Sequence, residues 1–231
     1  MIIGSGLLAR GFATQYQNRA DVCIYAAGVS NSSNTVLSEF ARERARLVVA
    51  LQSANDVDAF VYFGTCSVAD SEVQQTPYVQ HKLAMEQLVA EHPQHLILRL
   101  PQVAGHTPNP HTLLNYLYAR IVRSEAFSVW RDAYRNIIDV DDVATLANVL
   151  IENQSMRRCT LNLANPCGYS MPEIVKTMEQ VVGKQAIYDV VERGRHYEIE
   201  VTTMLTALSQ TQIHFDEHYL SRVLRKYYEK S

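Results

Sequence analysis

The chain has 231 residues, of which 47% are hydrophobic and 19% charged, and this length and composition suit one substantial core. A formal net charge of -3 gives no electrostatic case for binding nucleic acid or an anionic membrane surface. No apolar run approaches the roughly 18 residues of a membrane span, and residues 1–11 lack the pattern of a signal peptide, so we expect a cytoplasmic protein.

A short apolar stretch at the start of the chain leads directly into the motif Gly4-Ser-Gly6-Leu7-Leu8-Ala9. This Gly-x-Gly-x-x-Ala spacing, after a strand and before a helix, is typical of a dinucleotide-binding turn. The glycines allow a tight turn and close approach of a pyrophosphate, whose charge the helix N-terminus attracts. We therefore predict that Gly4, Gly6, Leu7 and Leu8 contact a nucleotide cofactor.

The segment after this turn is shorter than a dinucleotide-binding sheet requires. Residues 7–20 separate the motif from the next strand-like run, DVCIYAAG at 21–28, and one helix uses most of them. A strand-helix-strand unit needs about 30 residues or more, so the second and third strands are missing and the first strand is expected at or near the sheet edge. The acidic residue that would bind the adenine ribose is lost with them, because Asp21 begins a different strand.

A polar loop, VSNSSN at 29–34, follows the second strand-like run. Open parallel sheets bind ligands at the carboxyl ends of their strands, so Ser30 and Asn31 are candidate contacts, with ordinary loop chemistry as the alternative. Residues 35–53 then predict an amphipathic helix. Its charged residues are expected on a solvated face: Arg42, Glu43, Arg44 and Arg46.

The next strand and helix carry the strongest candidates for catalysis. The apolar and aromatic run at 59–64 is typical of a buried parallel strand and ends in Thr65-Cys66-Ser67. Tyr78 and Lys82 are four residues apart at the start of a helical pattern and so share a face. An ammonium near a phenol favours the phenolate, which suits proton transfer to a substrate oxygen held by Thr65. A surface aromatic beside a solvated lysine is the alternative interpretation.

The later segments predict a strand at 95–100, a turn from Pro101 through Gln102, and a loop, HTPNPH at 106–111, that we interpret as a substrate loop. A helix at 113–122 and a strand ending in Trp130 follow. Arg135 then precedes the run DVDDV, whose aspartates are expected to start a helix. The cysteines have no C-x-x-C spacing, and no metal site is predicted.

The order of these motifs resembles the extended short-chain dehydrogenase/reductase superfamily, in particular its NAD(P)-dependent nucleotide-sugar epimerases, dehydratases and reductases. The likeness extends from residue 1 to about residue 183. It implies an α/β fold with a shortened, Rossmann-like, doubly wound parallel sheet. One domain over 1–231 is expected, with a small substrate-binding lobe built from segments within 102–135 and 165–231.

The resemblance also implies roles for individual residues. It makes Tyr78 the catalytic acid/base, Lys82 its pKa partner and a ribose contact, and Thr65 the third catalytic member. The expected further cofactor contacts are Ala26, Ala27, Gly28 and Pro101. A guanidinium suits a pyrophosphate and an aromatic face suits a nucleobase. The expected substrate contacts are Ser30, Asn31, Cys66, Ser67, Gln102, Trp130 and Arg135.

The function implied is an NAD- or NADP-dependent oxidoreductase of a nucleotide-linked sugar, either a 4-keto-sugar reductase or a 4-epimerase in surface polysaccharide biosynthesis. A 4,6-dehydratase is disfavoured, since that branch carries Asp-Glu where this chain has Cys66-Ser67. A homodimer through helices 35–53 and 80–90 is also implied. The alternative is a catalytically inactive Rossmann-scaffold protein that binds a nucleotide or nucleotide sugar, as the missing strands would permit.

Overall fold

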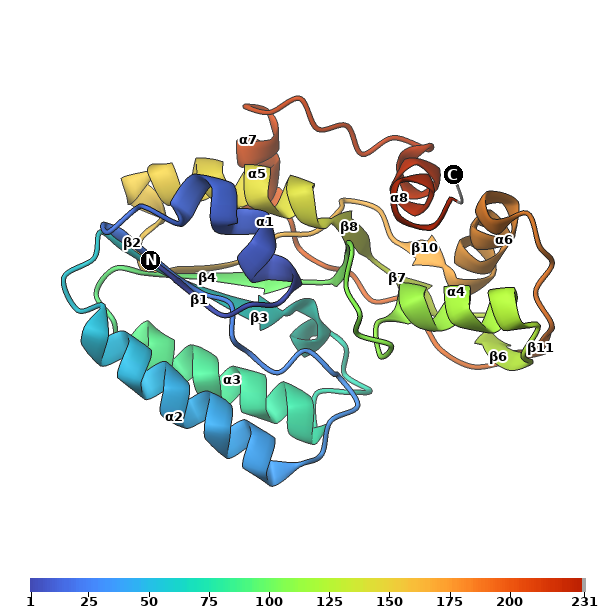
Figure 1. Ribbon diagram of the computed structural model, residues 1–231, viewed down its shortest axis with the longest axis horizontal. Coiled ribbons are helices and arrows are strands. Elements are labelled where there is room, and N and C mark those ends of the chain that lie inside the picture. Colours follow the sequence, from blue (N-terminus) through green and yellow to red (C-terminus); the bar gives the residue numbers. More distant parts are fainter. Residues whose placement is uncertain (230–231) are drawn as a thin grey trace.

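The computed structural model describes residues 1–229 and is built around a five-stranded parallel sheet of order β1-β2-β3-β4-β9. Helices cover both faces of this sheet (Figure 1). One face carries α1 (Leu7–Tyr16), α5 (Val140–Glu152) and α7 (Thr202–Leu208), and the other carries α2 (Leu37–Ser53) and α3 (Pro77–Ala90). The strands are β1 (Ile2–Ile3), β2 (Val22–Tyr25), β3 (Ala59–Thr65), β4 (His95–Leu100) and β9 (Cys159–Asn162). The predicted α/β, doubly wound class is confirmed.

Strand β3 shows why the sheet is buried on both faces. Every residue from Ala59 to Thr65 is buried, and successive side chains point to opposite faces. Val61 and Phe63 join the hydrophobic cluster under α1 and α5, whereas Phe60 and Tyr62 join the cluster under α2 and α3. A continuous apolar run therefore supplies two cores at once.

Strand β1 occupies the sheet edge, as the short segment after the glycine motif predicts. Its two residues pair in parallel with Ile24 and Tyr25 of β2, and within residues 1–229 no strand lies on its other side. The strand order is that of a Rossmann sheet without its second and third strands. The carboxyl ends of β1, β2 and β3 are consequently adjacent, which brings the glycine turn, the Ala-Ala-Gly segment and Thr65 to one edge.

A second cluster of elements lies beyond the carboxyl ends of β3 and β4 (Figure 1). A separate hydrophobic cluster holds its helices together, with Leu117, Ile174 and Leu224 at its centre. Strands β5 (Gln102–Ala104) and β8 (Ile137–Asp139) pair in parallel and connect it to the sheet. Its other elements are α4 (Leu113–Arg123), β6 (Phe127–Trp130), β7 (Tyr134–Arg135), β10 (Tyr169–Ser170), α6 (Met171–Val182), β11 (Tyr188–Val191) and α8 (Tyr219–Tyr228).

Local capping explains where several helices begin. Asp139 is the N-cap of α5 and accepts a hydrogen bond from the Asp141 backbone N–H at 2.9 Å, as the aspartate run predicts. Ser170 caps α6 in the same way, and α3 begins at Pro77. Two short 3-10 turns, η1 (Cys66–Ala69) and η2 (Gln154–Met156), complete the described elements. None of the helices described for residues 1–229 has the length and apolar character needed to cross a bilayer.

One helix orients differently from its sequence-based prediction. Glu43 was expected on the solvated face of α2, but it is 3% exposed and lies against α3. Leu37, a residue of the same helix, is 77% exposed. The reason is that α3 presents His81 and Lys82 to this face of α2, and their polar groups bind the carboxylate.

Candidate active site

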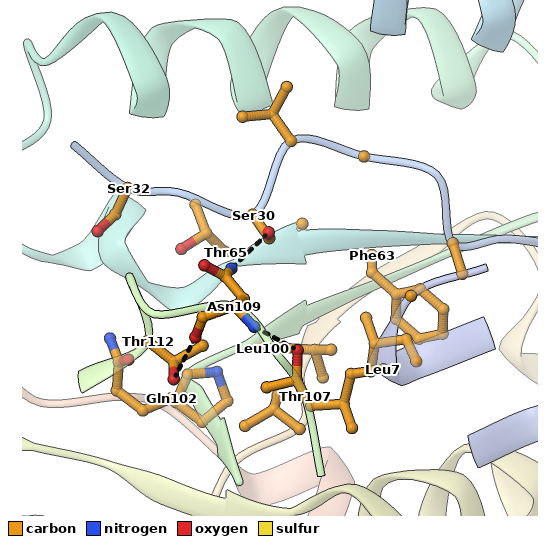
Figure 2. A pocket seen from close by; sticks show the side chains of 18 of the residues that line it. Leu7, Ser30, Ser32, Phe63, Thr65, Leu100, Gln102, Thr107, Asn109 and Thr112 are labelled. Carbon is orange, nitrogen blue, oxygen red and sulfur yellow. Dashed lines mark hydrogen bonds between the residues drawn. The ribbon is translucent and has the colours of Figure 1, made fainter. Parts of the chain in front are cut away.

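A cavity of about 530 Å³ opens at the carboxyl edge of the sheet, where the predicted motifs meet. It extends from the glycine turn, past the end of β3 and the start of α3, to Arg135. Figure 2 shows Thr65, Gln102 and the 107–112 loop around it. The predicted site residues that line it are Gly6, Leu7, Leu8, Ala26, Gly28, Ser30, Thr65, Ser67, Tyr78, Lys82, Pro101, Gln102 and Arg135.

The glycine turn has the geometry that a pyrophosphate requires. Gly4 has φ +131°, and a Cβ there would lie 2.4 Å from the Ala26 carbonyl oxygen, so only glycine fits. At Gly6, by contrast, a Cβ would meet nothing within 4 Å, which leaves room for a ligand. Helix α1 starts at this point with no side-chain cap and no acidic residue in its first turn. Its free N–H groups therefore favour an anion.

Thr65 and Tyr78 meet at the floor of the cavity. Thr65 is the last residue of β3, and its hydroxyl accepts a hydrogen bond from the Ser67 backbone N–H at 3.2 Å. Tyr78, in the first turn of α3, lines the same part of the cavity. Burial raises the pKa of Tyr78 to about 12, and the neighbouring Thr65 side chain opposes that rise. The phenol is therefore held as a proton donor.

Lys82 lies on the same face of α3 as Tyr78, but its ammonium is directed at other groups. Its Nζ donates to the Tyr62 hydroxyl at 3.1 Å, the Phe63 carbonyl at 3.3 Å and Glu43 Oε1 at 3.4 Å. No hydrogen bond to Tyr78 is formed within the described part of the chain. The expected lowering of the phenol pKa by Lys82 is thus not seen, since burial and Glu43 act in the opposite direction.

Glu43 is a site residue that sequence reasoning missed. Burial raises its pKa, but hydrogen bonds from His81 and the Val29 N–H, with the charge of Lys82, outweigh this and bring the pKa to about 2. Glu43 Oε2 lies 2.9 Å from His81 Nε2 and 2.7 Å from the Val29 nitrogen. The charged run around Glu43 contains no signal that distinguishes it from its solvated neighbours.

Some predicted site residues lie away from this cavity. Cys66 turns behind the strand end, where its thiol donates to the Arg99 carbonyl at 3.2 Å. Trp130 packs in the second cluster, with the Arg193 guanidinium 4.3 Å from the centre of its ring. Ala27 and Asn31 line a smaller hollow on the other side of the loop after β2. Gly4 shapes the turn without lining the cavity.

Two other segments complete the cavity wall. The loop after β5 crosses over it, with Asn109 Nδ2 donating to the Ser30 hydroxyl at 3.3 Å (Figure 2). Arg10 on α1 fastens the loop by donating to the His106 carbonyl at 2.8 Å. Tyr197 comes from an irregular segment and lines the cavity beside Ser67, and no sequence signal predicts it. The sequence predicts a substrate loop at 106–111, and four residues of this loop line the cavity: Thr107, Pro108, Asn109 and His111.

The adenosine side of the site lacks the usual acid. Asp21 precedes β2, at the opposite end of that strand from Ala26 and Gly28. Its carboxylate is paired with Arg19 at 2.6 Å and is not directed at the cavity. Asp21 therefore has no ribose-binding role, as its place at the start of a different strand predicts.

A parallel sheet with this strand order, a glycine turn at a helix N-terminus and a Thr-Tyr-Lys group at the carboxyl ends of the strands defines a dinucleotide-dependent enzyme scaffold. The model of the NAD dependent epimerase/dehydratase family matches residues 10–164, more than half of the chain. The chain therefore belongs to this family, and its family cofactor is a nicotinamide dinucleotide, as predicted. None of the curated proteins compared with the chain matches it.

Solved structures of similar fold include enzymes of nucleotide sugars. UDP-glucuronic acid 4-epimerase from Bacillus cereus, in complex with UDP-glucuronic acid and NAD, has a TM-score of 0.74 and 17% identity, over 97% of this chain and 79% of that chain. The dTDP-glucose 4,6-dehydratase from Bacillus anthracis, in complex with NAD, gives 0.68 and 14%, over 96% and 77%. RMD from Pseudomonas aeruginosa, complexed with NADPH, gives 0.66 and 15%, over 96% and 88%. At these identities the likeness establishes the fold.

Proposed function

We propose that the protein is an NAD- or NADP-dependent oxidoreductase of a nucleotide-linked sugar, acting as a 4-keto-sugar reductase or a 4-epimerase in surface polysaccharide biosynthesis. The observation that carries the proposal is that Thr65, Tyr78 and Lys82 line one cavity together with the glycine turn. Two structural neighbours support the substrate and cofactor classes: one is bound to UDP-glucuronic acid and NAD, and the other to NADPH.

The cofactor binds across the carboxyl edge of the sheet in this proposal. The free N–H groups of Leu7 and Leu8 would hold the pyrophosphate, and Pro101 would border the nicotinamide end. The nicotinamide supplies or accepts the hydride. Tyr78 donates its proton to a carbonyl oxygen as the carbon is reduced, and takes the proton back from the carbinol in the opposite direction. Thr65 orients that oxygen through its hydroxyl.

The far end of the cavity is assigned to the substrate nucleotide. Arg135, at the end of β7, lines this end together with Gln102 and Tyr197. A guanidinium binds a diphosphate through paired N–H donors, and a tyrosine ring offers an apolar face to a sugar or base. The sugar would then lie between Arg135 and the Thr65–Tyr78 pair.

Two measurements test the proposal in sequence. Titration of the protein with NADH and NADPH, followed by nicotinamide fluorescence, is expected to show binding of at least one. A panel of 4-keto-sugar nucleotides and UDP-hexoses is then screened for oxidation of the reduced cofactor and for epimer formation. Failure of both cofactors to bind at millimolar concentration would remove the enzyme proposal. Binding with no turnover across the panel would favour an inactive nucleotide-binding protein.

A further inference from the structure

The carboxylate of Glu43 is buried between α2 and α3, behind the Lys82 side chain that lines the cavity. Val29 N–H and His81 contact its Oε2 at 2.7 and 2.9 Å, and the Tyr62 hydroxyl donates to its Oε1 at 3.1 Å. Lys82 Nζ lies 3.4 Å from the same Oε1. Burying a carboxylate costs much free energy unless the charge is paired and hydrogen-bonded, and here both oxygens have hydrogen-bonding partners.

The ammonium of Lys82 is equally enclosed. It has three N–H donors, and the structure provides three acceptors: the Tyr62 hydroxyl, the Phe63 carbonyl and Glu43. Tyr62 relays the contact, because it accepts from Lys82 and donates to Glu43. Its ring also lies under the ammonium, with 5.0 Å from Nζ to the ring centre. The lysine is therefore fixed in position by groups from β3 and α2.

His81 secures the carboxylate from the opposite side. Its ring stacks on Phe40 of α2 at 4.5 Å between ring centres, with an interplanar angle of 18°. The side chain is 7% exposed, and its Nε2 bonds the Glu43 oxygen that faces away from Lys82. Adjacent residues of α3 thus bind the two oxygens of one carboxylate on α2.

We propose that Glu43 is a positioning residue for Lys82: together with His81 and Tyr62 it holds the lysine as a charged ammonium at the floor of the cavity. The consequence for cofactor binding rests on the proposed function. Removing the carboxylate leaves a buried ammonium with only the more distant carboxylate of Glu86 near it, which favours the neutral amine.

The charged groups around Lys82 all bear on its ionisation. Burial lowers the pKa of Lys82, while Glu43 from α2 and the more distant Glu86 from α3 raise it. Tyr62 from β3 and Tyr78 from α3 are both neutral, because burial raises the pKa of each phenol. Glu43 is the carboxylate in hydrogen-bonding contact with the ammonium, so it is the main support of the charge.

Competitive acetylation measures this charge without any cofactor or substrate. Acetic anhydride reacts with the neutral amine, and Lys82 lines the cavity, so its acetylation rate between pH 6.5 and 10, read by peptide mass spectrometry, follows its ionisation. Glu43→Gln is expected to raise the rate at pH 7.5 by about tenfold or more, which corresponds to a drop of about one pKa unit. Glu39→Gln is the matched control, because Glu39 is a half-buried carboxylate one turn earlier on α2 that binds Asn34 and does not contact Lys82.

Further variants keep the test decisive if Glu43→Gln folds poorly. Glu43→Asp keeps the carboxylate but moves it away from Lys82, and His81→Gln removes a partner of the carboxylate. Each is expected to shift the pH profile of Lys82 acetylation in the same direction as Glu43→Gln, but by less. Equal Lys82 rates in wild type and all three variants, including no labelling in any, would overturn the proposal.

A cofactor titration distinguishes this proposal from the proposed function. For wild type, NADH affinity is expected to be constant from pH 6.5 to 8.5, whereas for Glu43→Gln it falls as pH rises and Lys82 loses its proton. If wild type binds neither NADH nor NADPH, the proposed function fails, and the acetylation profile still decides the role of Glu43. If NADH binds but the Glu43→Gln profiles match wild type, the role of Glu43 fails alone.

Discussion

Removing the Tyr78 hydroxyl tests the catalytic assignment with a single atom. Tyr78 is 8% exposed, so in Tyr78→Phe the ring remains packed and only the hydroxyl beside Thr65 is lost. Losing one polar contact of this kind costs about 1 kcal/mol of stability. For a chain of this length, that loss lowers the Tm by about 2–4 °C. Turnover should fall far more, by about 10²- to 10⁴-fold, since the proton donor is gone.

Tyr16→Phe provides the matched control. Its hydroxyl is also buried and donates to Asn148 Oδ1 at 2.7 Å, but it lies between α1 and α5, away from the cavity. Both variants are assayed by thermal unfolding and by oxidation of reduced cofactor with the substrate found in the screen. Tyr16→Phe should lose similar stability and keep its turnover. Near wild-type turnover in Tyr78→Phe, or an equal loss in both variants, would refute the assignment.

Four other predictions follow from the same geometry. Gly4→Ala should weaken NADH binding at least tenfold and also lower the Tm, because the added Cβ would meet the Ala26 carbonyl. Gly6→Ala should weaken NADH binding but leave the Tm unchanged, because its Cβ would meet no protein atom within 4 Å. Arg135→Gln should raise the KM for the sugar nucleotide with little effect on NADH affinity, and a lower kcat alone would contradict its placement. Glu43 has a folded-state pKa of about 2, below its unfolded value of about 4.3. The difference in free energy of unfolding between wild type and Glu43→Gln should therefore be largest above pH 5 and shrink as pH falls toward 2. A difference that stays constant in acid unfolding experiments would contradict this. A homodimer through α2 and α3 is expected in light scattering, and Val49→Glu, at a position 61% exposed on α2, should convert it to a monomer.

Local sequence determined most of the scaffold. The apolar runs at 59–64 and 95–100 have the composition of buried parallel strands, and they form β3 and β4. The glycine spacing required a tight turn, which Gly4 provides with its positive φ. The missing strands could be inferred by counting residues between the glycine turn and the next strand, and this placed β1 at the edge. Each of these features depends on residues that are close together in the chain.

Tertiary packing decided the electrostatics of the site. Nothing in the run around Glu43 separates it from neighbouring charges, and it becomes a buried partner of Lys82 only because α2 and α3 pack against the same face of β3. Tyr197 reaches the cavity from an irregular segment more than a hundred residues after Ser67, which it contacts. The Tyr78–Lys82 spacing predicted a shared helix face, but the direction of the ammonium depends on acceptors from β3 and α2. Burial and long-range contacts set these properties, and a local pattern of residue types does not encode them.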